Sequence, residues 1–208
     1  MTPVHIGLDL DNTIIDYSSV FAPIAAELGL LPQGHGLRSK DEIKSRLRDL
    51  AGDDTLWMRL QGQVYGKFIG LARPYDGAIA AIRGFRAAGH RVSIVSHKTR
   101  LGHFDPDHVD LWDAASGWLA TNGLVGEAGP IAPSDVHYRV TREEKVDTIS
   151  RLDFALFVDD LPEVLGHPNF PASLPAILFS PDGEHGADGR FRLARSWQEV
   201  MDMTAGLV

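Results

Sequence analysis

Cysteine is absent from the 208 residues of this chain. Its absence excludes disulfide bonds, thiol nucleophiles and cysteine-ligated zinc sites, and it is typical of proteins in the reducing cytoplasm. The N-terminus also lacks a basic segment followed by a long apolar run, so the sequence predicts no signal peptide. No apolar run approaches the ~18 residues that suggest a membrane-spanning helix. We therefore expect a cytoplasmic protein with no membrane partner.

Basic residues are fewer than acidic residues in this chain. Lys and Arg number 20 against 28 Asp and Glu, which leaves a formal net charge of −8. Because a protein that binds nucleic acid needs a basic face to meet the phosphates, this balance argues against nucleic acid as a partner. Hydrophobic residues make up 44% and charged residues 23% of the chain, as in an ordinary globular protein. The length fits one domain, or one domain that carries an insertion.

Strand-like and helix-like patterns alternate along most of the sequence. Short apolar, β-prone runs predict strands at residues 4–8, 91–96, 135–140, 154–158 and 175–179. Apolar residues at helical spacing predict helices between them, and capping-box patterns begin two of these helices at Thr141 and Ser196. The alternation predicts an α/β fold, with a Rossmann-like parallel sheet and helices on both faces.

Residues 17–72 interrupt this alternation with three helical patterns and no strand. The second pattern opens with the capping box Ser39-x-x-Glu42. Apolar stripes at this spacing usually face a core, so we interpret them as packing surfaces. The sequence therefore predicts a small all-helical subdomain inserted after the first strand, while residues 1–16 and 73–208 form the α/β core.

The first predicted strand runs into two acids that are separated by one residue, Asp9 and Asp11. Because side chains alternate along a strand, both carboxylates can point to the same side. At the carboxyl end of a strand they would face the crevice where α/β sheets bind ligands, and their oxygens suit a hard cation such as Mg²⁺. The alternative is a strand end followed by an Asx turn.

Three further polar positions follow in order along the chain. Ser96 ends an apolar strand, Lys145 lies near the start of a helix, and the pair Asp159 and Asp160 follows another apolar strand. Each position also has a structural interpretation. A serine after a strand is often a helix N-cap, and a lysine on a helix is usually solvated.

This order of motifs resembles the haloacid dehalogenase-like (HAD) superfamily. The family's first motif, Asp-x-Asp-x-Thr, is matched by residues 9–13, and its second, a Ser or Thr that ends an apolar strand, by Ser96. Its third motif is a lysine before the next strand, matched by Lys145, and its fourth is an acidic pair, matched by residues 159–160. Four motifs in the expected order and strand context make a specific match that covers about the whole chain.

The resemblance implies a role for each residue. Asp9, which is ionised at neutral pH, would attack phosphorus without the help of a base and form an aspartyl-phosphate. Asp11 would be the general acid and base. Ser96 would hydrogen-bond a phosphoryl oxygen, and Lys145 would neutralise negative charge there. Thr13 would brace the turn that follows Asp11.

The resemblance also implies a Mg²⁺ site. Its ligands would be a carboxylate oxygen of Asp9, the main-chain carbonyl of Asp11 and the carboxylate of Asp160. Asp159 would act on the metal through a water molecule or by supporting the direct ligands. The insertion at residues 17–72 resembles the family's helical C1-type cap, which we expect to act as a lid that excludes bulk water and selects small substrates.

The leading hypothesis is a HAD-like phosphoric monoester hydrolase, a Mg²⁺-dependent phosphatase that acts on a small phosphorylated metabolite such as a sugar phosphate or a nucleotide. An acid at Asp11 favours this activity, because family members that cleave carbon–halogen or carbon–phosphorus bonds lack it. The Asp-Asp pair with a helical cap also resembles the 5'(3')-deoxyribonucleotidases. Two alternatives stay open: a phosphomutase or phosphotransferase, and a non-catalytic protein that binds phosphorylated ligands. The sequence leaves the oligomeric state open.

Two other groups of polar residues carry weaker signals. His97 and Lys98 follow Ser96 and either contact the substrate or lie in an exposed loop. Residues 103–110 are rich in Asp and His, but they lack the glycine spacing of a calcium loop, so a solvated loop with a helix N-cap is favoured over a second metal site. A Ser96–His97 hydrolase dyad is excluded, because adjacent strand residues face opposite ways and no Gly-x-Ser-x-Gly turn is present.

Overall fold

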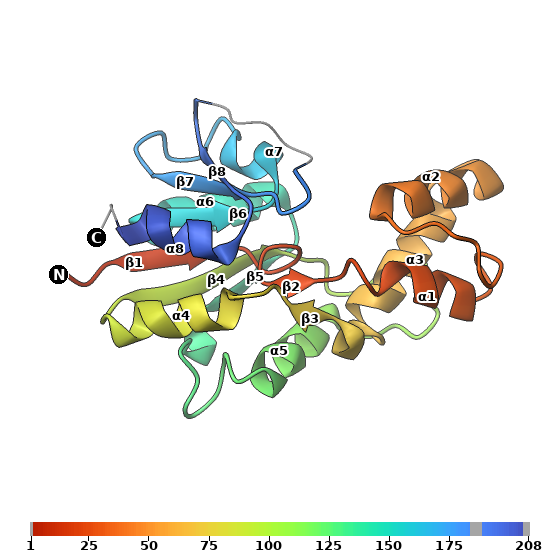
Figure 1. Cartoon of the computed structure of the whole chain (residues 1–208), viewed down its shortest axis with the longest axis horizontal. Coiled ribbons are helices and arrows are strands. Elements are labelled where there is room, and N and C mark those ends of the chain that lie inside the picture. Colours follow the sequence, from red (N-terminus) through yellow and green to blue (C-terminus); the bar gives the residue numbers. More distant parts are fainter. Residues whose placement is uncertain (1, 184–188, 206–208) are drawn as a thin grey trace. The chain divides into compact units, whose positions relative to one another are not determined.

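The computed structural model of this protein describes residues 2–183 and 189–205, and the chain divides into two compact units (Figure 1). The first unit consists of Met1–Ile15, Pro74–Lys98 and Asn122–Val208. The second consists of Asp16–Arg73 and Thr99–Thr121. Besides the segment predicted as a helical insertion, the second unit therefore includes residues 99–121, which the sequence analysis assigned to the core.

A six-stranded sheet forms the centre of the first unit. Its strands are β1 (His5–Leu8), β4 (Arg91–His97), β5 (Val136–Arg139), β6 (Leu156–Asp159), β7 (Ala176–Phe179) and β8 (Arg192–Ala194). They lie in the order β5-β4-β1-β6-β7-β8, and every neighbouring pair is parallel. The chain builds outward from β1 through β4 to β5, and it then crosses to the other side of β1 with β6. The prediction of a Rossmann-like parallel sheet is confirmed.

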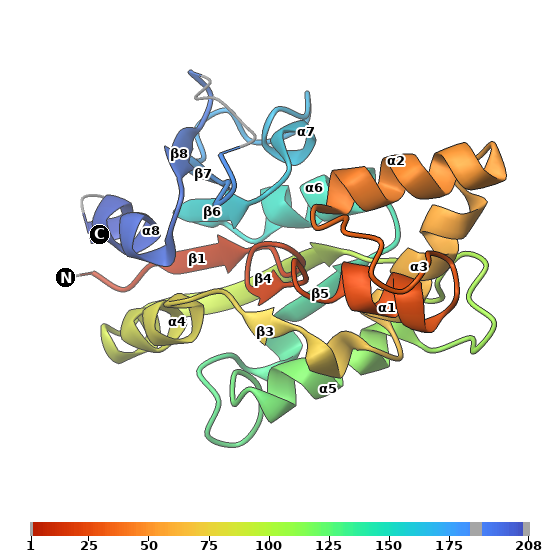
Figure 2. The ribbon, with the colours of Figure 1, turned by 45° about the vertical axis from the view of Figure 1, so that its right-hand side comes forward.

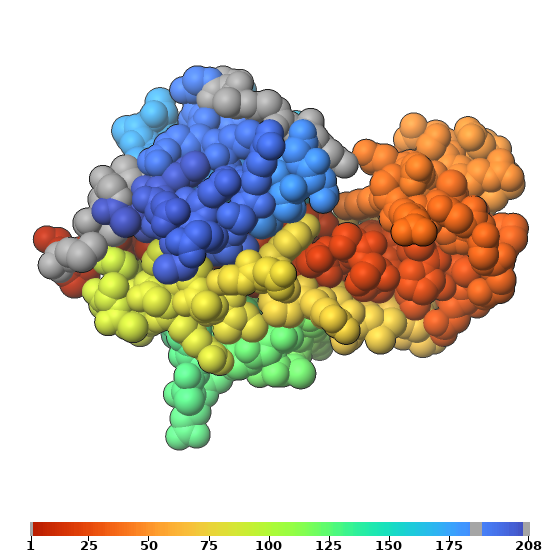
Figure 3. Space-filling model, in the orientation of Figure 1, coloured from red at the N-terminus to blue at the C-terminus, as the bar shows by residue number. Residues whose placement is uncertain are grey.

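Helices cover both faces of this sheet, as Figures 1 and 2 show. On one face α4 (Ala78–Ala87) packs beside α8 (Trp197–Ala205), and the two helices adjoin on the surface in Figure 3. On the other face α6 (Arg142–Arg151) and α7 (Pro162–Leu165) share an apolar cluster with β6 and β7. Coverage on both sides explains why β6 and β7 are buried along their whole length.

Gly7 in β1 leaves room for aromatic side chains from the neighbouring strand β6 and the residues before it. A Cβ at this position would overlap the ring of Phe157 and lie 2.9 Å from the ring of Phe154. Such contacts are shorter than van der Waals separation, so any larger residue would push β1 away from the aromatic cluster. Since β1 carries the first of the two motif acids at its end, the position of Asp9 depends on this glycine.

The second unit is predominantly helical. It contains α1 (Phe21–Glu27), α2 (Lys40–Ala51), α3 (Thr55–Tyr65), the 3₁₀ turn η1 (Ile69–Leu71) and α5 (Leu111–Thr121). The predicted capping box of α2 is confirmed, because Ser39 accepts a hydrogen bond from the Glu42 N–H and the Glu42 carboxylate accepts one from the Ser39 N–H. Phe21 of α1 stacks on Trp57 of α3 with ring centroids 5.1 Å apart, which places aromatic residues in the core of this unit.

Several short elements were not predicted from the sequence. These are β8, α7, the 3₁₀ turn η2 (Pro133–Asp135), and the two-stranded sheet of β2 (Ile15–Asp16) and β3 (Arg73–Pro74). Elements of two to four residues are too short to show a hydrophobic period, so tertiary pairing alone defines them. No helix in the described part of the chain is both long and apolar enough to cross a membrane.

Candidate active site

Three adjacent strands end at one edge of the sheet of the first unit, and each carries a polar residue there. Asp9 directly follows β1, Ser96 is near the end of β4, and Asp159 ends β6. The backbone N–H of Asp9 donates to the carbonyl of Val158 in β6 at 2.8 Å, which fixes the acid beside that strand. The site thus lies where the strand order changes direction around β1, the usual ligand position in open α/β sheets.

Lys145 connects two of these strand ends. Its Nζ lies 2.6 Å from Oδ1 of Asp9 and 2.7 Å from Oδ2 of Asp159, and its side chain is 1% exposed. The capping box of Thr141 and Glu144, which the sequence predicted, starts α6 at the point that lets the helix present this lysine to the sheet. The alternative of a solvated helix lysine is therefore wrong.

The electrostatics of this group follow from its burial. Burial raises the pKa of Asp9 above its ordinary value of 3.8; Lys145 opposes the rise, while the charges of Asp159 and Asp11 add to it. Burial alone would lower the pKa of Lys145, but the carboxylates of Asp159 and Asp9 outweigh that effect and raise it. Lys145 thus faces two carboxyl groups, and the acids of the site outnumber its two buried lysines, Lys145 and Lys98, which leaves an excess of negative charge that a further cation would relieve.

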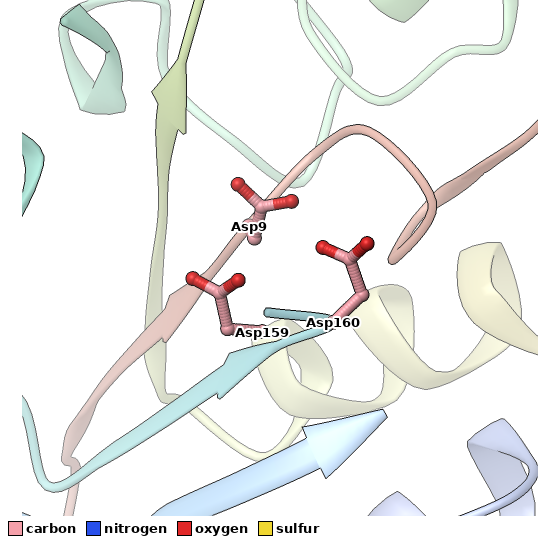
Figure 4. A group of neighbouring side chains, drawn as sticks. All are labelled: Asp9, Asp159 and Asp160. Atoms are coloured by element: carbon pink, nitrogen blue, oxygen red, sulfur yellow. The ribbon is translucent and has the colours of Figure 1, made fainter. Parts of the chain in front are cut away.

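Asp160 adds a third carboxylate from the residue after β6. Asp9, Asp159 and Asp160 each offer an oxygen, and these oxygens lie within 4.8 Å of one another; Figure 4 shows the carboxylates converging from the ends of β1 and β6. In the described ranges this is the one group of three or more acidic or histidine residues arranged in this way. Hard oxygen donors at this spacing fit a magnesium-sized cation.

The two neighbouring acids of this group differ in their surroundings. Oδ1 of Asp159 accepts a hydrogen bond from the Leu161 N–H at 3.0 Å, and Oδ2 is paired with Lys145 at 2.7 Å. Asp159 is completely buried, whereas Asp160 is partly exposed at the edge of the sheet. Both oxygens of Asp159 thus have protein partners.

Ser96 contributes a buried hydroxyl to the same edge. The residue is 1% exposed, and its Oγ has no hydrogen-bond partner among the described residues. A buried hydroxyl without a partner costs free energy unless a ligand supplies one, so the interpretation of Ser96 as a helix N-cap does not hold. The ring of His97 turns the other way, with Nε2 3.0 Å from the carbonyl of Val140, as expected for adjacent strand residues.

Thr13 closes the loop after the first motif. Its Oγ1 donates to Oδ2 of Asp9 at 3.4 Å, and its carbonyl accepts a hydrogen bond from the Trp197 indole at 3.0 Å. The bracing role expected for Thr13 is therefore visible, and the tryptophan that holds it comes from the C-terminal helix. No local signal in the sequence connects residues 184 positions apart.

Lys98 is the site residue to which sequence analysis assigned no definite role. Its Nζ lies 2.7 Å from Oδ2 of Asp11, and its side chain is 2% exposed. It is therefore a buried member of the first unit and not part of an exposed loop. Its spacing in the sequence could have indicated this position, because a residue two positions after Ser96 lies on the same side of an extended chain.

The acidic loop at residues 103–110 has a structural explanation. The Asp105 carboxylate is buried and accepts hydrogen bonds from the backbone N–H groups of Asp107 and Val109 and from the amide of Gln63. Asp110 accepts hydrogen bonds from the first N–H groups of α5, as the favoured N-cap interpretation predicted. These carboxylates hold the loop and the helix end within the second unit.

Comparison with known proteins identifies the fold. No family model and no curated protein sequence matches this chain. Among solved structures, a magnesium-bound HAD hydrolase from Bacillus subtilis is 14% identical with a TM-score of 0.62, over 98% of this chain and 99% of that one. A predicted phosphatase from Clostridium acetobutylicum is also 14% identical with a TM-score of 0.62, over 99% and 100% of the two chains.

A third similar structure is a HAD-like hydrolase from Burkholderia xenovorans, which is 17% identical over 100% of this chain and 99% of that one, with a TM-score of 0.56. At this level of identity the likeness concerns the fold. The chain therefore has the fold of the HAD superfamily, as the order of its motifs predicted.

Proposed function

We propose that this protein is a Mg²⁺-dependent phosphatase that hydrolyses a small phosphomonoester through an aspartyl-phosphate on Asp9. The observation that carries the proposal is the pairing of Asp9 with Lys145 beside Ser96, a buried hydroxyl that has no hydrogen-bond partner among the described residues. A nucleophile, a cation and a hydroxyl at one strand edge are the groups that phosphoryl transfer needs. The HAD fold supports the same reaction class.

The proposed metal site uses carboxylate oxygens of Asp9 and Asp160 and the main-chain carbonyl of Asp11. The converging oxygens of the acidic group and the shortage of positive charge around them fit a divalent cation. When bound, Mg²⁺ supplies positive charge that favours the ionised form of Asp9 and reduces its repulsion from an anionic phosphate. In this proposal Asp159 is not a direct ligand of the metal; it supports the site through its ion pair with Lys145.

In the first half of the proposed reaction, a carboxylate oxygen of Asp9 attacks the phosphorus atom. A bond forms between that oxygen and phosphorus while the ester bond from phosphorus to the leaving oxygen breaks, and Asp11 donates a proton to the leaving alcohol. The Ser96 hydroxyl donates a hydrogen bond to a phosphoryl oxygen, and Lys145 balances the negative charge that accumulates beside Asp9.

In the second half, Asp11 is a carboxylate and accepts a proton from a water molecule. The oxygen of that water attacks the phosphorus atom of the aspartyl-phosphate, and the bond from phosphorus to the Asp9 oxygen breaks. Inorganic phosphate leaves, Asp9 is again a carboxylate, and Asp11 is again protonated for the next cycle. A sugar hydroxyl in place of water would give the phosphomutase reaction.

A phosphate-release screen tests the proposal. The purified protein is incubated with Mg²⁺ and a panel of sugar phosphates and nucleotides, and inorganic phosphate is measured with the Asp9→Asn variant as the blank. We expect release from at least one small phosphomonoester by the wild type and none by the variant. Formation of an isomeric sugar phosphate would favour a mutase. Binding without any turnover would overturn the proposal in favour of a non-catalytic phospho-ligand protein.

A further inference from the structure

Lys98 is the second buried lysine of the candidate active site. Its side chain is 2% exposed, whereas lysine is almost never fully buried unless it is paired. Its partner is Asp11, at 2.7 Å, and the Asp11 side chain is itself 16% exposed. The two buried lysines thus form ion pairs with different acids of the first motif, since Lys145 is paired with Asp9. The reaction steps described above use Lys145 and leave Lys98 without a role.

The backbone of Lys98 is hydrogen-bonded to the sheet. Its backbone N–H donates to the carbonyl of Arg139 at 2.8 Å, so hydrogen bonding to β5 continues one residue beyond the end of β4. The alternation along this extended segment sends His97 toward the carbonyl of Val140 and places Lys98 on the same side as Ser96. The side chain of Lys98 therefore extends from backbone that belongs to the sheet edge.

We propose that Lys98 is a positioning residue for Asp11, an inference that rests on the proposed function. An aspartate after the end of a strand can rotate about two side-chain bonds, and general acid catalysis requires its proton to point at the leaving oxygen. Lys98 holds Oδ2, as an ion pair when Asp11 is a carboxylate and as a charge–dipole contact when Asp11 is protonated, so the proton is carried on Oδ1. Lys98 thus acts on the reaction through Asp11 and not by contact with the substrate.

This proposal differs measurably from the alternative that Lys98 binds the phosphate or another anionic part of the substrate. A substrate contact would raise KM, and its loss would add to the loss caused by removing Asp11. A residue that acts through Asp11 would lower kcat, most for substrates whose leaving group needs protonation. Once Asp11 is replaced, removing such a residue would cause no further loss of activity.

The experiment is a double-mutant cycle of Lys98→Met and Asp11→Asn. Methionine keeps the length of the side chain and removes the charge. Kinetics are measured with p-nitrophenyl phosphate, whose leaving group needs little protonation, and with the sugar phosphate turned over best in the phosphate-release screen. We expect Lys98→Met to lower kcat for the sugar phosphate about 10- to 100-fold with little change in KM, the scale of a small misplacement of a catalytic group.

The same cycle gives two further expected results. The loss with p-nitrophenyl phosphate should be several-fold smaller than the loss with the sugar phosphate. The double variant should be no slower than Asp11→Asn alone. Lys98→Arg should recover part of the activity, and Lys67→Met, which breaks an exposed ion pair with Asp107, should leave kcat unchanged. The double variant also removes the buried charge pair as a whole, so it remains informative if Lys98→Met alone does not fold.

Failure of the proposed role of Lys98 and failure of the proposed phosphatase activity would give different results. Additive losses, a rise in KM with kcat unchanged, or equal losses with both substrates would overturn the role of Lys98 while the wild type remains an active phosphatase. A wild type that releases no phosphate from any substrate would overturn the proposed function and this inference with it.

Discussion

The Nζ atom of Lys145 lies 2.6 Å from Oδ1 of Asp9, although the two residues are 136 positions apart in the sequence. The same ammonium group lies 2.7 Å from Asp159. This bridge ties α6 to the ends of β1 and β6, so its loss should affect folding as well as activity.

The first prediction is that Lys145→Met lowers the free energy of unfolding by about 3–5 kcal/mol, because it leaves buried carboxylates without their counter-charge. Urea unfolding in metal-free buffer measures the change. Lys67→Met is the matched control; its ion pair with Asp107 is about half exposed on both sides, so its loss should cost at most about 1 kcal/mol. Equal losses for the two variants would show that the Lys145 bridge does not stabilise the fold.

The second prediction is that Mg²⁺ stabilises the protein in the absence of substrate. A ligand present at 100 times its Kd adds about 2.7 kcal/mol to the free energy of unfolding, which raises Tm by several degrees for a chain of this size. Thermal unfolding with Mg²⁺ and with EDTA measures the shift. Asp160→Asn should remove most of it, whereas Asp147→Asn, at an exposed position of α6, should retain it. An unchanged shift in Asp160→Asn would contradict the assignment of Asp160 as a metal ligand.

The third prediction concerns the proton transfer assigned to Asp11. Asp11→Asn keeps the main-chain carbonyl but removes the titrating group, so we expect turnover of alkyl phosphates to fall roughly 10²–10⁴-fold. The fall should be smaller for p-nitrophenyl phosphate, which has a better leaving group. Steady-state kinetics with both substrates check this. A loss of the same size for both would mean that Asp11 does not protonate the leaving oxygen.

The fourth prediction concerns the close approach at Gly7. Gly7→Ala should destabilise the protein by about 1–3 kcal/mol, because the new methyl group overlaps the Phe157 ring. Gly84→Ala is the matched control in α4 of the same unit. A Cβ there meets only a side-chain atom of Met201 at 3.9 Å, so alanine should stabilise the helix by roughly 0.5–1 kcal/mol. Urea unfolding of both variants should give changes of opposite sign, and a neutral Gly7→Ala would contradict the packing described for β1.

The fifth prediction concerns pH. Nδ1 of His5 donates to the Leu152 carbonyl at 2.9 Å, and Nε2 accepts from the Ser93 hydroxyl at 2.7 Å, so the ring is satisfied in its neutral form. Burial lowers the pKa of His5 below 6.5, with Arg91 adding to the effect and the Leu152 carbonyl opposing it. The unfolded state then takes up the proton first, so the stability from His5 is complete above about pH 6.5 and declines as the pH falls.

The comparison of the wild type with His5→Gln isolates this contribution. The raised pKa of Asp9 acts in the opposite direction, but it is present in both proteins and cancels in the difference. The difference in the free energy of unfolding should be constant above pH 7 and should decrease progressively below pH 6.5. Parallel pH profiles for the two proteins would rule out His5 as the source of the decline.

The sequence determined those features that depend on neighbours within a few positions. The capping boxes at Ser39 and Thr141 formed as predicted, because their hydrogen bonds join residues only three apart. Apolar β-prone runs located β1, β4 and β6, and the alternation with helices indicated a parallel sheet. Since parallel strands end at one edge, the order of the motifs was enough to predict that Asp9, Ser96 and Asp159 would meet.

Tertiary structure alone decided which partner each of these groups has. Asp159 and Asp160 are equivalent in the sequence, but only Asp159 is buried against Lys145. Lys98 could have been an exposed loop residue, and its pairing with Asp11 depends on how β4 lies beside β1. Lys98 and Asp11 lie 87 positions apart, and Lys145 and Asp159 lie 14 positions apart on a helix and a strand. Such pairs depend on how separate elements pack, where burial and the need to pair each charge select one arrangement among several that the local sequence allows.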